Sequence, residues 1–399
     1  MKITPELCIR CRGTKYLCGL TYCPLMVKLS VPKIESTDIY GSSPPSIFVG
    51  RFNYPKVNVY PSAPPIVGDT RDFEDPKHWL KIDLNEFLKM RLSLVRGGIK
   101  MDVNSAQNPN RLLIDIHSIV LPLRPVDINL ELKKPPKGGE LSEDLPPLGP
   151  SAPLKALEIS RLPSPSRLVE RIYQDDDLKA MDGIIELYNN NIDVEDIARL
   201  LSVGMLGVKR KLVPTRWSIT AVDTTVSNYL VEKIKQYDTI DKVEVYVRSF
   251  RKNLFIAILL PQKWSFEWGE AWYPGSTWNK FGNDVGIEVD YEGYNGRKDY
   301  PEIGGCYYAS RVGVAEYLAK RKRQATAILF REIYSGFDLP MGVWFVRENI
   351  RELFKAKLMI FDTLDQALEY LKGVLKTDIN LWRAKSGLLK RETIDKWMV

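Results

Sequence analysis

The chain has little histidine and lacks the short motifs that mark the common families of nucleotide-binding and hydrolytic enzymes. Two histidines, His78 and His117, occur in 399 residues, and no Gly-Lys pair exists to form a Walker A loop. The patterns G-x-G-x-x-G, H-E-x-x-H and G-x-S-x-G are absent as well. His117 lies in an apolar run, where we expect a hydrogen-bonded core residue. These absences disfavour a catalytic triad that depends on histidine.

Long hydrophobic runs are missing too. No apolar stretch approaches the roughly 18 residues that suggest a membrane-spanning helix, so the sequence predicts no membrane partner. The N-terminus contains no apolar run of the length that a secretory signal needs. We therefore expect a cytoplasmic protein in a reducing compartment. A chain of this length can hold two or more domains of roughly 100 to 200 residues each.

Cysteine is scarce except at the N-terminus, where four of the five cysteines fall within 23 positions: Cys8, Cys11, Cys18 and Cys23. A segment this short cannot bury enough apolar surface to fold alone, and four thiolates converging on one Zn²⁺ would supply the missing free energy. Such a site would be closed and structural, without an open position for a catalytic water. Two disulfides are the alternative, although a reducing compartment favours the metal. The sequence therefore predicts a zinc module over residues 1–30.

The apolar periodicities predict a mixed α+β fold without the regular alternation of a doubly wound sheet. Many prolines over residues 31–76 predict irregular chain with short edge strands such as 46–49. Strands are also expected over 112–121, 126–132, 243–247, 254–260 and 342–346. Helices are expected over 79–94, 193–202, 311–331, 347–357 and 365–376.

The charge balance is mildly basic, with 57 basic and 50 acidic residues and a net charge of +7. A surface for polyanions must therefore come from local clustering. One segment combines cations, a proline and an aromatic residue: Lys209, Arg210, Lys211, Pro214, Arg216 and Trp217. This combination is typical of a lining that holds phosphates and stacks on bases. A helix end followed by a buried strand would produce a similar pattern.

Three carboxylates are candidates for acid–base chemistry. Asp223 follows the basic segment, and Glu267 and Glu270 lie among three tryptophans whose apolar setting could raise a carboxyl pKa. Each also has a simpler interpretation as a structural cap or a surface charge. Cys306 stands apart from the other cysteines and is expected to be a small buried side chain rather than a nucleophile. Whether the chain is an enzyme stays open.

The last nine residues carry an apolar pattern. Ile394, Trp397 and Met398 stand at positions i, i+3 and i+4, so one helical turn would place them on a single face. A short apolar face of this kind is typical of a peptide that binds in a groove of a partner. The alternative is that the tail docks onto its own domain.

Together these features resemble the archaeal Nre family of DNA-repair proteins. The similarity rests on the cysteine cluster, residues 200–223, 304–311, 323–325 and 342–348, and the tail. It implies a core in two parts, 31–275 and 276–385, and a tail, 386–399, that binds the replication sliding clamp, PCNA. Its contact residues would be Arg391, Ile394, Trp397 and Met398. Clamp-binding peptides usually begin with Gln and end in an aromatic residue, whereas this chain has Arg391 and Met398 at those positions.

The sequence thus predicts a DNA-repair factor that docks on the clamp, holds one structural zinc, and binds DNA or a nucleotide through the basic segment. Two rival interpretations remain. One is an enzyme acting on a phosphorylated or nucleotide substrate, with Lys211 and Arg216 on the phosphate and Asp223 or Glu270 as the base. The other is a scaffold without catalytic activity.

Overall fold

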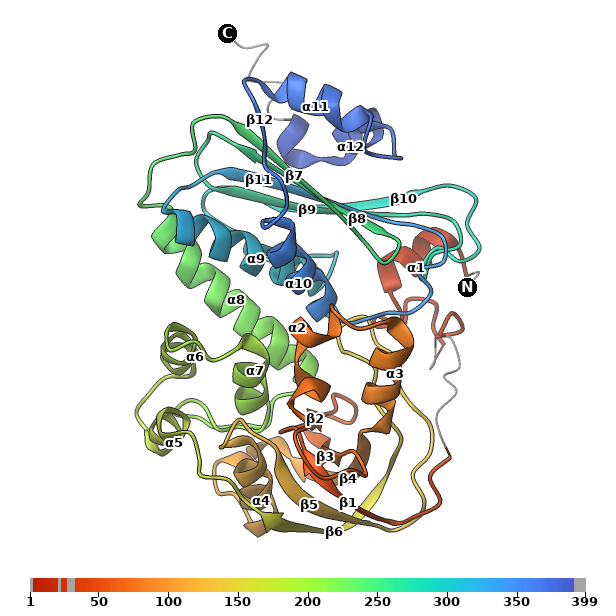
Figure 1. Ribbon diagram of the computed structural model, residues 1–399, viewed down its shortest axis with the longest axis vertical. Helices are drawn as coiled ribbons and strands as arrows, with labels where there is room; N and C mark the ends of the chain where they lie inside the picture. The colour runs from red at the N-terminus through yellow and green to blue at the C-terminus, as the bar shows by residue number, and fades with distance from the viewer. Residues whose placement is uncertain (1–2, 21–22, 27–32, 391–399) are drawn as a thin grey trace. The chain divides into compact units, whose positions relative to one another are not determined.

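The computed structural model describes residues 3–20, 23–26 and 33–390, which fall into two compact units. Unit 1 comprises Met1–Val27, Ser142–Asp144 and Ser227–Val399, and unit 2 comprises Lys28–Leu141 and Leu145–Val226. Each unit holds a six-stranded mixed sheet with helices, which confirms the predicted α+β class (Figure 1). Within the described ranges, no helix has both the length and the apolar character needed to cross a membrane.

The sheet of unit 1 has the strand order β10-β9-β11-β8-β7-β12. Strands β9 and β11 run parallel, and the other neighbouring pairs are antiparallel. Arg251 and Lys252, both with positive φ, form the two-residue turn between β7 and β8, as hairpin geometry requires. The strands are β7 (Val243–Phe250), β8 (Asn253–Leu260), β9 (Ser265–Trp272), β10 (Gly286–Glu292), β11 (Thr326–Ile333) and β12 (Met359–Phe361).

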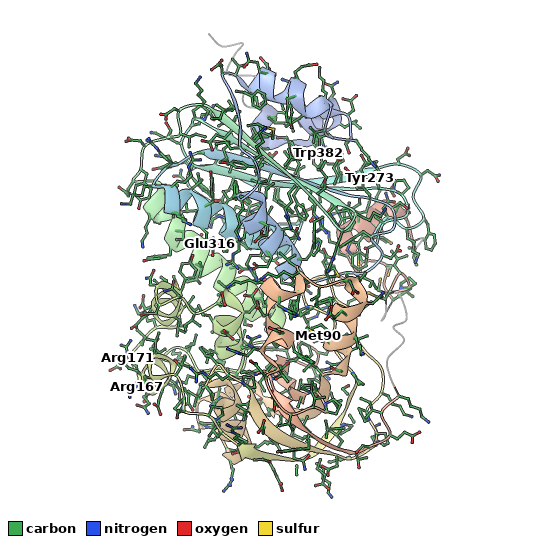
Figure 2. The ribbon with its side chains drawn as sticks, in the orientation of Figure 1. Met90, Arg167, Arg171, Tyr273, Glu316 and Trp382 are labelled. Atoms are coloured by element: carbon green, nitrogen blue, oxygen red, sulfur yellow. The ribbon has the colours of Figure 1, made fainter. Side chains whose placement is uncertain are left out.

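Helices cover both faces of this sheet. Figure 1 shows α9 (Cys306–Arg321) and α10 (Val343–Leu353) on one face, and α11 (Leu364–Lys372) and α12 (Ile379–Lys385) on the other. Every residue of β8 and β11 is buried, as expected for strands covered on both faces. On the α11–α12 face Trp382 stacks on Phe330, with 4.2 Å between the ring centroids (Figure 2). Helix α1 (Pro5–Cys11) packs against β10.

The sheet of unit 2 has the order β1-β5-β6-β4-β3-β2, with β4 and β6 parallel. Its strands are β1 (Asp38–Ser43), β2 (Ile47–Val49), β3 (Lys56–Ala63), β4 (Val95–Asp102), β5 (Val126–Leu132) and β6 (Ser151–Arg161). Its helices are η1 (Arg71–Glu74), α2 (Pro76–Trp79), α3 (Leu84–Ser93), η2 (Val103–Ala106), α4 (Arg111–Val120), α5 (Arg167–Gln174), α6 (Ala180–Asn189) and α7 (Val194–Ser202). Helix α8 (Thr215–Ile234) starts among residues of unit 2 and ends among residues of unit 1.

Several elements appear as the sequence predicts. Strand β2 is the predicted edge strand, β5, β7 and β8 match the predicted strands, and α7 matches the helix predicted over 193–202, with Asp193 as its N-cap. Helices α3 and α11 lie within the predicted helical ranges, apart from one residue at the start of α11. His117 is the expected core residue: its ring bonds Tyr173 and the carbonyl of Val203, and burial lowers its pKa to about 4.

Three predicted elements are wrong. Residues 112–121 form α4 instead of a strand, because Asn110 caps the helix by accepting a hydrogen bond from the amide of Leu113. Residues 342–346 form the start of α10 rather than a strand. The helix expected over 311–331 ends at Arg321, where Lys322 adopts a left-handed conformation, and the remainder of that range enters β11.

The two units divide the chain differently from the predicted ranges. The predicted boundary at 275 lies within unit 1, because β9 before it pairs with β10 and β11 after it. The division falls instead at Val226 and Ser227, inside α8. The described N-terminal residues, predicted as a module of their own, group with unit 1.

Candidate functional site

The four N-terminal cysteines are placed by a short helix and a tight turn. Thr4 caps α1 by accepting a hydrogen bond from the amide of Leu7, and Pro5 occupies its first turn. Cys8 and Cys11 therefore stand one helical turn apart. Arg12 ends the helix in a left-handed conformation and Gly13 also has positive φ, so the chain reverses before Cys18 and Cys23.

All four thiols line one small cavity of about 20 Å³, closed in part by Leu25 and Trp278. Burial and the proximity of the other three cysteines raise the pKa of Cys8 to about 11. None of the five cysteines, all of which the structure describes, forms a disulfide. Among the described residues, no three histidine, cysteine or acidic side chains are arranged to hold a metal ion. The four predicted ligands therefore line one cavity, and the other three affect the ionisation of Cys8, but their side chains are not arranged as a metal site.

Arg12, which follows Cys11, is buried and makes several contacts between the cysteine segment and the rest of unit 1. Its guanidinium lies 2.7 Å from Glu270 and 3.3 Å from Glu288. It donates hydrogen bonds to the carbonyl of Ile303 at 2.9 Å and to the sulfur of Cys306 at 3.3 Å. These carboxylates keep the pKa of Arg12 above its usual range even though burial opposes the charge. The cation is therefore held by an acidic pocket in the protein interior.

Glu270, predicted as a possible base, is fully buried on β9 between two arginines. Arg331 of β11 donates to it at 3.0 Å, while Arg12 lies on its other oxygen. Arg331 also bonds Asn253 at 2.9 Å, and both arginines stand over the ring of Trp272. This arrangement neutralises the carboxylate rather than presenting it to a substrate. Cys306 is buried as predicted, and burial raises the pKa of its thiol well above the usual value.

Glu143 completes the cluster from the segment 142–144. Its carboxylate accepts a hydrogen bond from the indole of Trp278 at 2.7 Å and lies 3.8 Å from Arg12. Burial, with some repulsion from Glu270, raises its pKa to about 7 despite the attraction of Arg12. Sequence analysis missed both Glu143 and Arg12, because nothing in the local pattern distinguishes a buried charge from the exposed charges around it.

Stability should depend on pH through Glu143. Between the ordinary carboxyl pKa of 4.5 and the folded value of about 7, the folded state keeps a proton that the unfolded state has released. Stability from this group is therefore lost as the pH rises through that window. We expect Glu143→Gln to match the parent chain near pH 4.5 and to be more stable at pH 8 by roughly 3 kcal/mol. Urea unfolding at both pH values, with Glu302→Gln as the exposed control, measures the difference; an equal effect at both would contradict it.

The basic segment lies on unit 2, between α7 and α8. Lys209 and Lys211 are exposed, whereas Arg210 packs over the ring of Tyr173 and pairs with Asp176 at 3.0 Å. Trp217, in the first turn of α8, is 44% exposed, and its ring lies 5.4 Å from that of Tyr54. Of the predicted residues, Lys209, Lys211 and Trp217 are therefore exposed at the surface. Arg210 instead forms an ion pair within unit 2.

The start of α8 is fixed by hydroxyl groups. Thr215 accepts a hydrogen bond from the amide of Val49 at 2.8 Å, and its hydroxyl lies 3.1 Å from that of Ser202. These contacts hold Arg216 and Trp217 at the helix N-terminus next to the β2–β3 loop. Asp223 lies two turns further along α8 and is buried, at 1% exposure. Because Asp223 is buried, it does not lie at the surface beside the exposed lysines. The structure therefore gives no support to its predicted role as a base.

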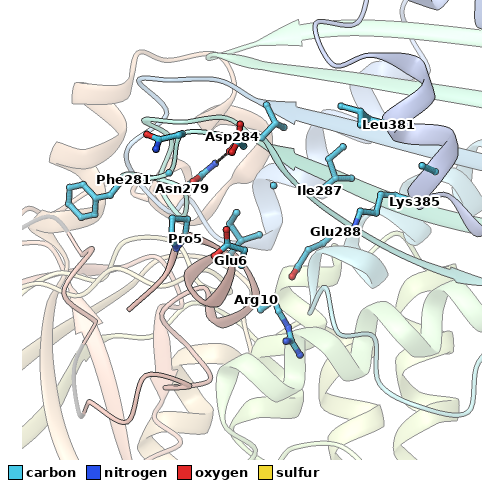
Figure 3. A pocket seen from close by; sticks show the side chains of 16 residues that line it. Pro5, Glu6, Arg10, Asn279, Phe281, Asp284, Ile287, Glu288, Leu381 and Lys385 are labelled. Carbon is cyan, nitrogen blue, oxygen red and sulfur yellow. Dashed lines mark hydrogen bonds between the residues drawn. The ribbon is translucent and has the colours of Figure 1, made fainter. Parts of the chain in front are cut away.

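A larger cavity of about 740 Å³ lies in unit 1, lined by α1, residues 279–288 and α12. Figure 3 shows Arg10, Glu288 and Lys385 around it, together with Asn279, which donates a hydrogen bond to the carbonyl of Asp284. Its lining mixes both signs of charge with apolar side chains such as Ile287 and Leu381. None of the predicted site residues that the structure describes lines it. The predicted clamp-binding residues at 391–398 lie outside the described residues.

Comparison with known proteins identifies the family. Residues 17–279 match the family described as Archaeal Nre, N-terminal, and residues 292–397 match Archaeal Nre, C-terminal. No solved structure matches the chain.

Curated relatives align over nearly the whole chain. It is 46% identical over 96% of its length to the DNA repair protein NreB of Archaeoglobus fulgidus, covering 97% of that protein. The DNA repair protein NreA of the same organism is 34% identical, with 97% of each chain covered. NreA of Haloferax volcanii is 36% identical over 89% of this chain and 87% of its own length. The chain therefore belongs to the archaeal Nre family.

Proposed function

We propose that this chain is a DNA-repair factor that binds DNA or a nucleotide through the segment Lys209–Asp223 of unit 2. The main support is that Lys209, Lys211 and Trp217 are exposed. They lie on a segment, 206–222, that contains no acidic residue. Lysines supply the attraction to phosphates, and an exposed indole supplies a face for a base. The names of the relatives, each a DNA repair protein, give the repair context. A role on DNA fits the cytoplasmic location expected from the sequence.

Removing both lysines should weaken binding to DNA. We expect Lys209→Ala with Lys211→Ala to lower the affinity and to reduce the slope of log K against log salt by about 2, because each lost phosphate contact lowers the counterions released by about one. Fluorescence anisotropy of a labelled oligonucleotide at several salt concentrations measures both quantities. The matched control is Lys133→Ala with Lys134→Ala, an exposed lysine pair on another loop of unit 2. Identical slopes for the two double variants would refute the assignment.

We further propose that the N-terminal segment holds one structural Zn²⁺ through Cys8, Cys11, Cys18 and Cys23. Two observations support such a role: the four cysteines line the same cavity, and burial together with the other three cysteines raises the pKa of Cys8 and so the cost of its ionisation. A divalent cation would reverse that cost by pairing with the thiolates. The metal would stabilise the fold and supply no catalytic step.

The zinc proposal predicts one equivalent of metal per purified chain. Cys18→Ala should release the metal and loosen the N-terminal segment, because three thiolates leave the tetrahedral site incomplete. Metal analysis by mass spectrometry and proteolysis of the N-terminal segment measure the two effects. Cys306→Ala, which removes a thiol outside the cluster, should retain the metal. Protein that is free of zinc and carries two disulfides when isolated without oxygen would overturn the proposal.

We also propose that the tail docks on the sliding clamp through Ile394, Trp397 and Met398. Support comes from the spacing of these residues and from the family, whose C-terminal match extends to residue 397. Leu388 and Leu389, which lie just before the last described residue, Lys390, are buried in the core of unit 1. The tail therefore starts from a fixed anchor on unit 1.

A further inference from the structure

Two exposed aromatic side chains lie on the β2–β3 loop of unit 2, which sequence analysis did not single out. Phe52 is 56% exposed and Tyr54 is 50% exposed. Asn53 between them has a φ of 63°, which Asn tolerates better than most residues and which helps to form the tight turn. Because both rings are exposed, packing in the core of unit 2 does not explain why aromatic side chains stand at these positions.

Hydrogen bonds join this loop to the basic segment. The amide of Val49 donates to the hydroxyl of Thr215 at one end of the loop. At the other end, Pro55 accepts from the amide of Val103, and Val103 in turn accepts from the amide of Leu212, both at 2.9 Å. The Tyr54 and Trp217 rings then meet at 5.4 Å with an angle of 55° between their planes. Loop and segment therefore form one continuous surface of unit 2.

The two segments that form this surface carry only positively charged side chains. Residues 47–60 and 206–222 contain no Asp or Glu. Lys56, Lys209 and Lys211 are exposed, and the guanidinium of Arg51 lies over the ring of Phe52 at 5.2 Å. Two acidic residues stand next to these segments: Asp102, opposite Lys56, caps η2, and Asp176 pairs with Arg210. Exposed rings among cations suit a polyanion that also offers flat apolar faces.

We propose that Phe52, Tyr54 and Trp217 form a stacking surface for the bases of single-stranded DNA. The proposal rests on the proposed function, because it assigns the nucleic acid that the basic segment would hold. In a duplex the faces of the bases are covered by their neighbours, so the rings can stack only on bases that are unpaired and unstacked. The lysines beside the rings contact the backbone phosphates of the same strand.

The test compares single-stranded and duplex oligonucleotides of one sequence, with the full chain and anisotropy as the readout. We expect Phe52→Ala and Trp217→Ala each to weaken single-strand binding about tenfold, in line with the loss of one stacked base. Duplex binding and the salt slope should hardly change, because no cation is removed. Trp217→Phe should recover much of the affinity. Tyr40→Ala, which removes a 50% exposed ring on β1, should have no effect. Circular dichroism checks that each variant is folded.

The outcomes separate this inference from the proposed function. If the Lys209 and Lys211 double variant loses affinity while the aromatic variants bind single strands like the parent chain, the stacking surface is refuted and the basic segment stands. If the parent chain binds neither form of DNA, the proposed function falls first. Tighter binding to an RNA strand of the same sequence would reassign the surface to RNA.

Discussion

Truncation after Lys390 should abolish binding to the sliding clamp without lowering the melting temperature. Apolar anchors at the centre of a small interface carry most of its binding energy, and truncating one commonly costs about 2 kcal/mol or more. Loss of Ile394, Trp397 and Met398 together therefore removes the interface. The cut must follow Leu389, since Leu388 and Leu389 are buried and the amide of Leu388 donates to Glu267 at 2.9 Å. A cut before Ser386 should lower the melting temperature, because it removes Leu388 and Leu389 from the core of unit 1.

Calorimetric titration of the clamp with the full and truncated chains decides this point. Trp397→Ala should behave like the truncation, whereas Lys396→Ala, on the polar side of the predicted turn, should bind almost normally. Arg391→Gln should tighten binding, since clamp-binding peptides usually carry Gln at that position. If the truncated chain binds the clamp as well as the full chain does, the motif is refuted. A lower melting temperature on truncation after Lys390 would indicate that the tail docks on its own domain.

Arg12→Ala should destabilise unit 1 strongly, by roughly 3 to 5 kcal/mol, because it leaves buried carboxylates without their cation. Glu270 would keep only Arg331, and Glu288 would lose its contact at 3.3 Å. Urea unfolding of the variant and the parent chain measures the loss. Arg10→Ala is the matched control: Arg10 lies on helix α1, which Arg12 ends, but its ion pair with Glu302 is exposed and 4.0 Å long, so its removal should have little effect. Similar stabilities for the two variants would contradict the role assigned to Arg12.

The fold was predictable where local pattern and packing agree. The runs in β7 and β8 are apolar and bounded by a turn, and the first turn of α7 is acidic after an Asp cap. Prediction failed where two signals compete. The apolar run 112–121 fits a strand or a buried helix equally well, and the Asn110 cap decides for the helix. In the range 311–331 the helical pattern continues past Arg321, but Thr326–Ile333 is drawn into the sheet between β8 and β9.

The candidate site was predictable only in part. The exposed lysines and Trp217 are recognisable in the sequence because they cluster within nine positions. Tyr54 and Phe52 stand more than 150 positions away and join them through the contacts of Val49 and Pro55 and through the Tyr54 ring itself, which no local pattern reveals. The burial of Asp223 and the pairing of Glu270 with two arginines are likewise properties of the folded chain. Tertiary packing, rather than composition, determines which charged side chains remain exposed to a ligand.

The measurement that tests the central claim most directly is photo-crosslinking of the full chain to single-stranded DNA that carries 5-bromodeoxyuridine, followed by mass mapping of the crosslinked peptides. If Phe52, Tyr54 and Trp217 stack on bases, crosslinks form in the β2–β3 loop and in the segment Lys209–Trp217, and they disappear when unlabelled single strands compete. Competed crosslinks confined to unit 1, with none in these two segments of unit 2, would contradict it.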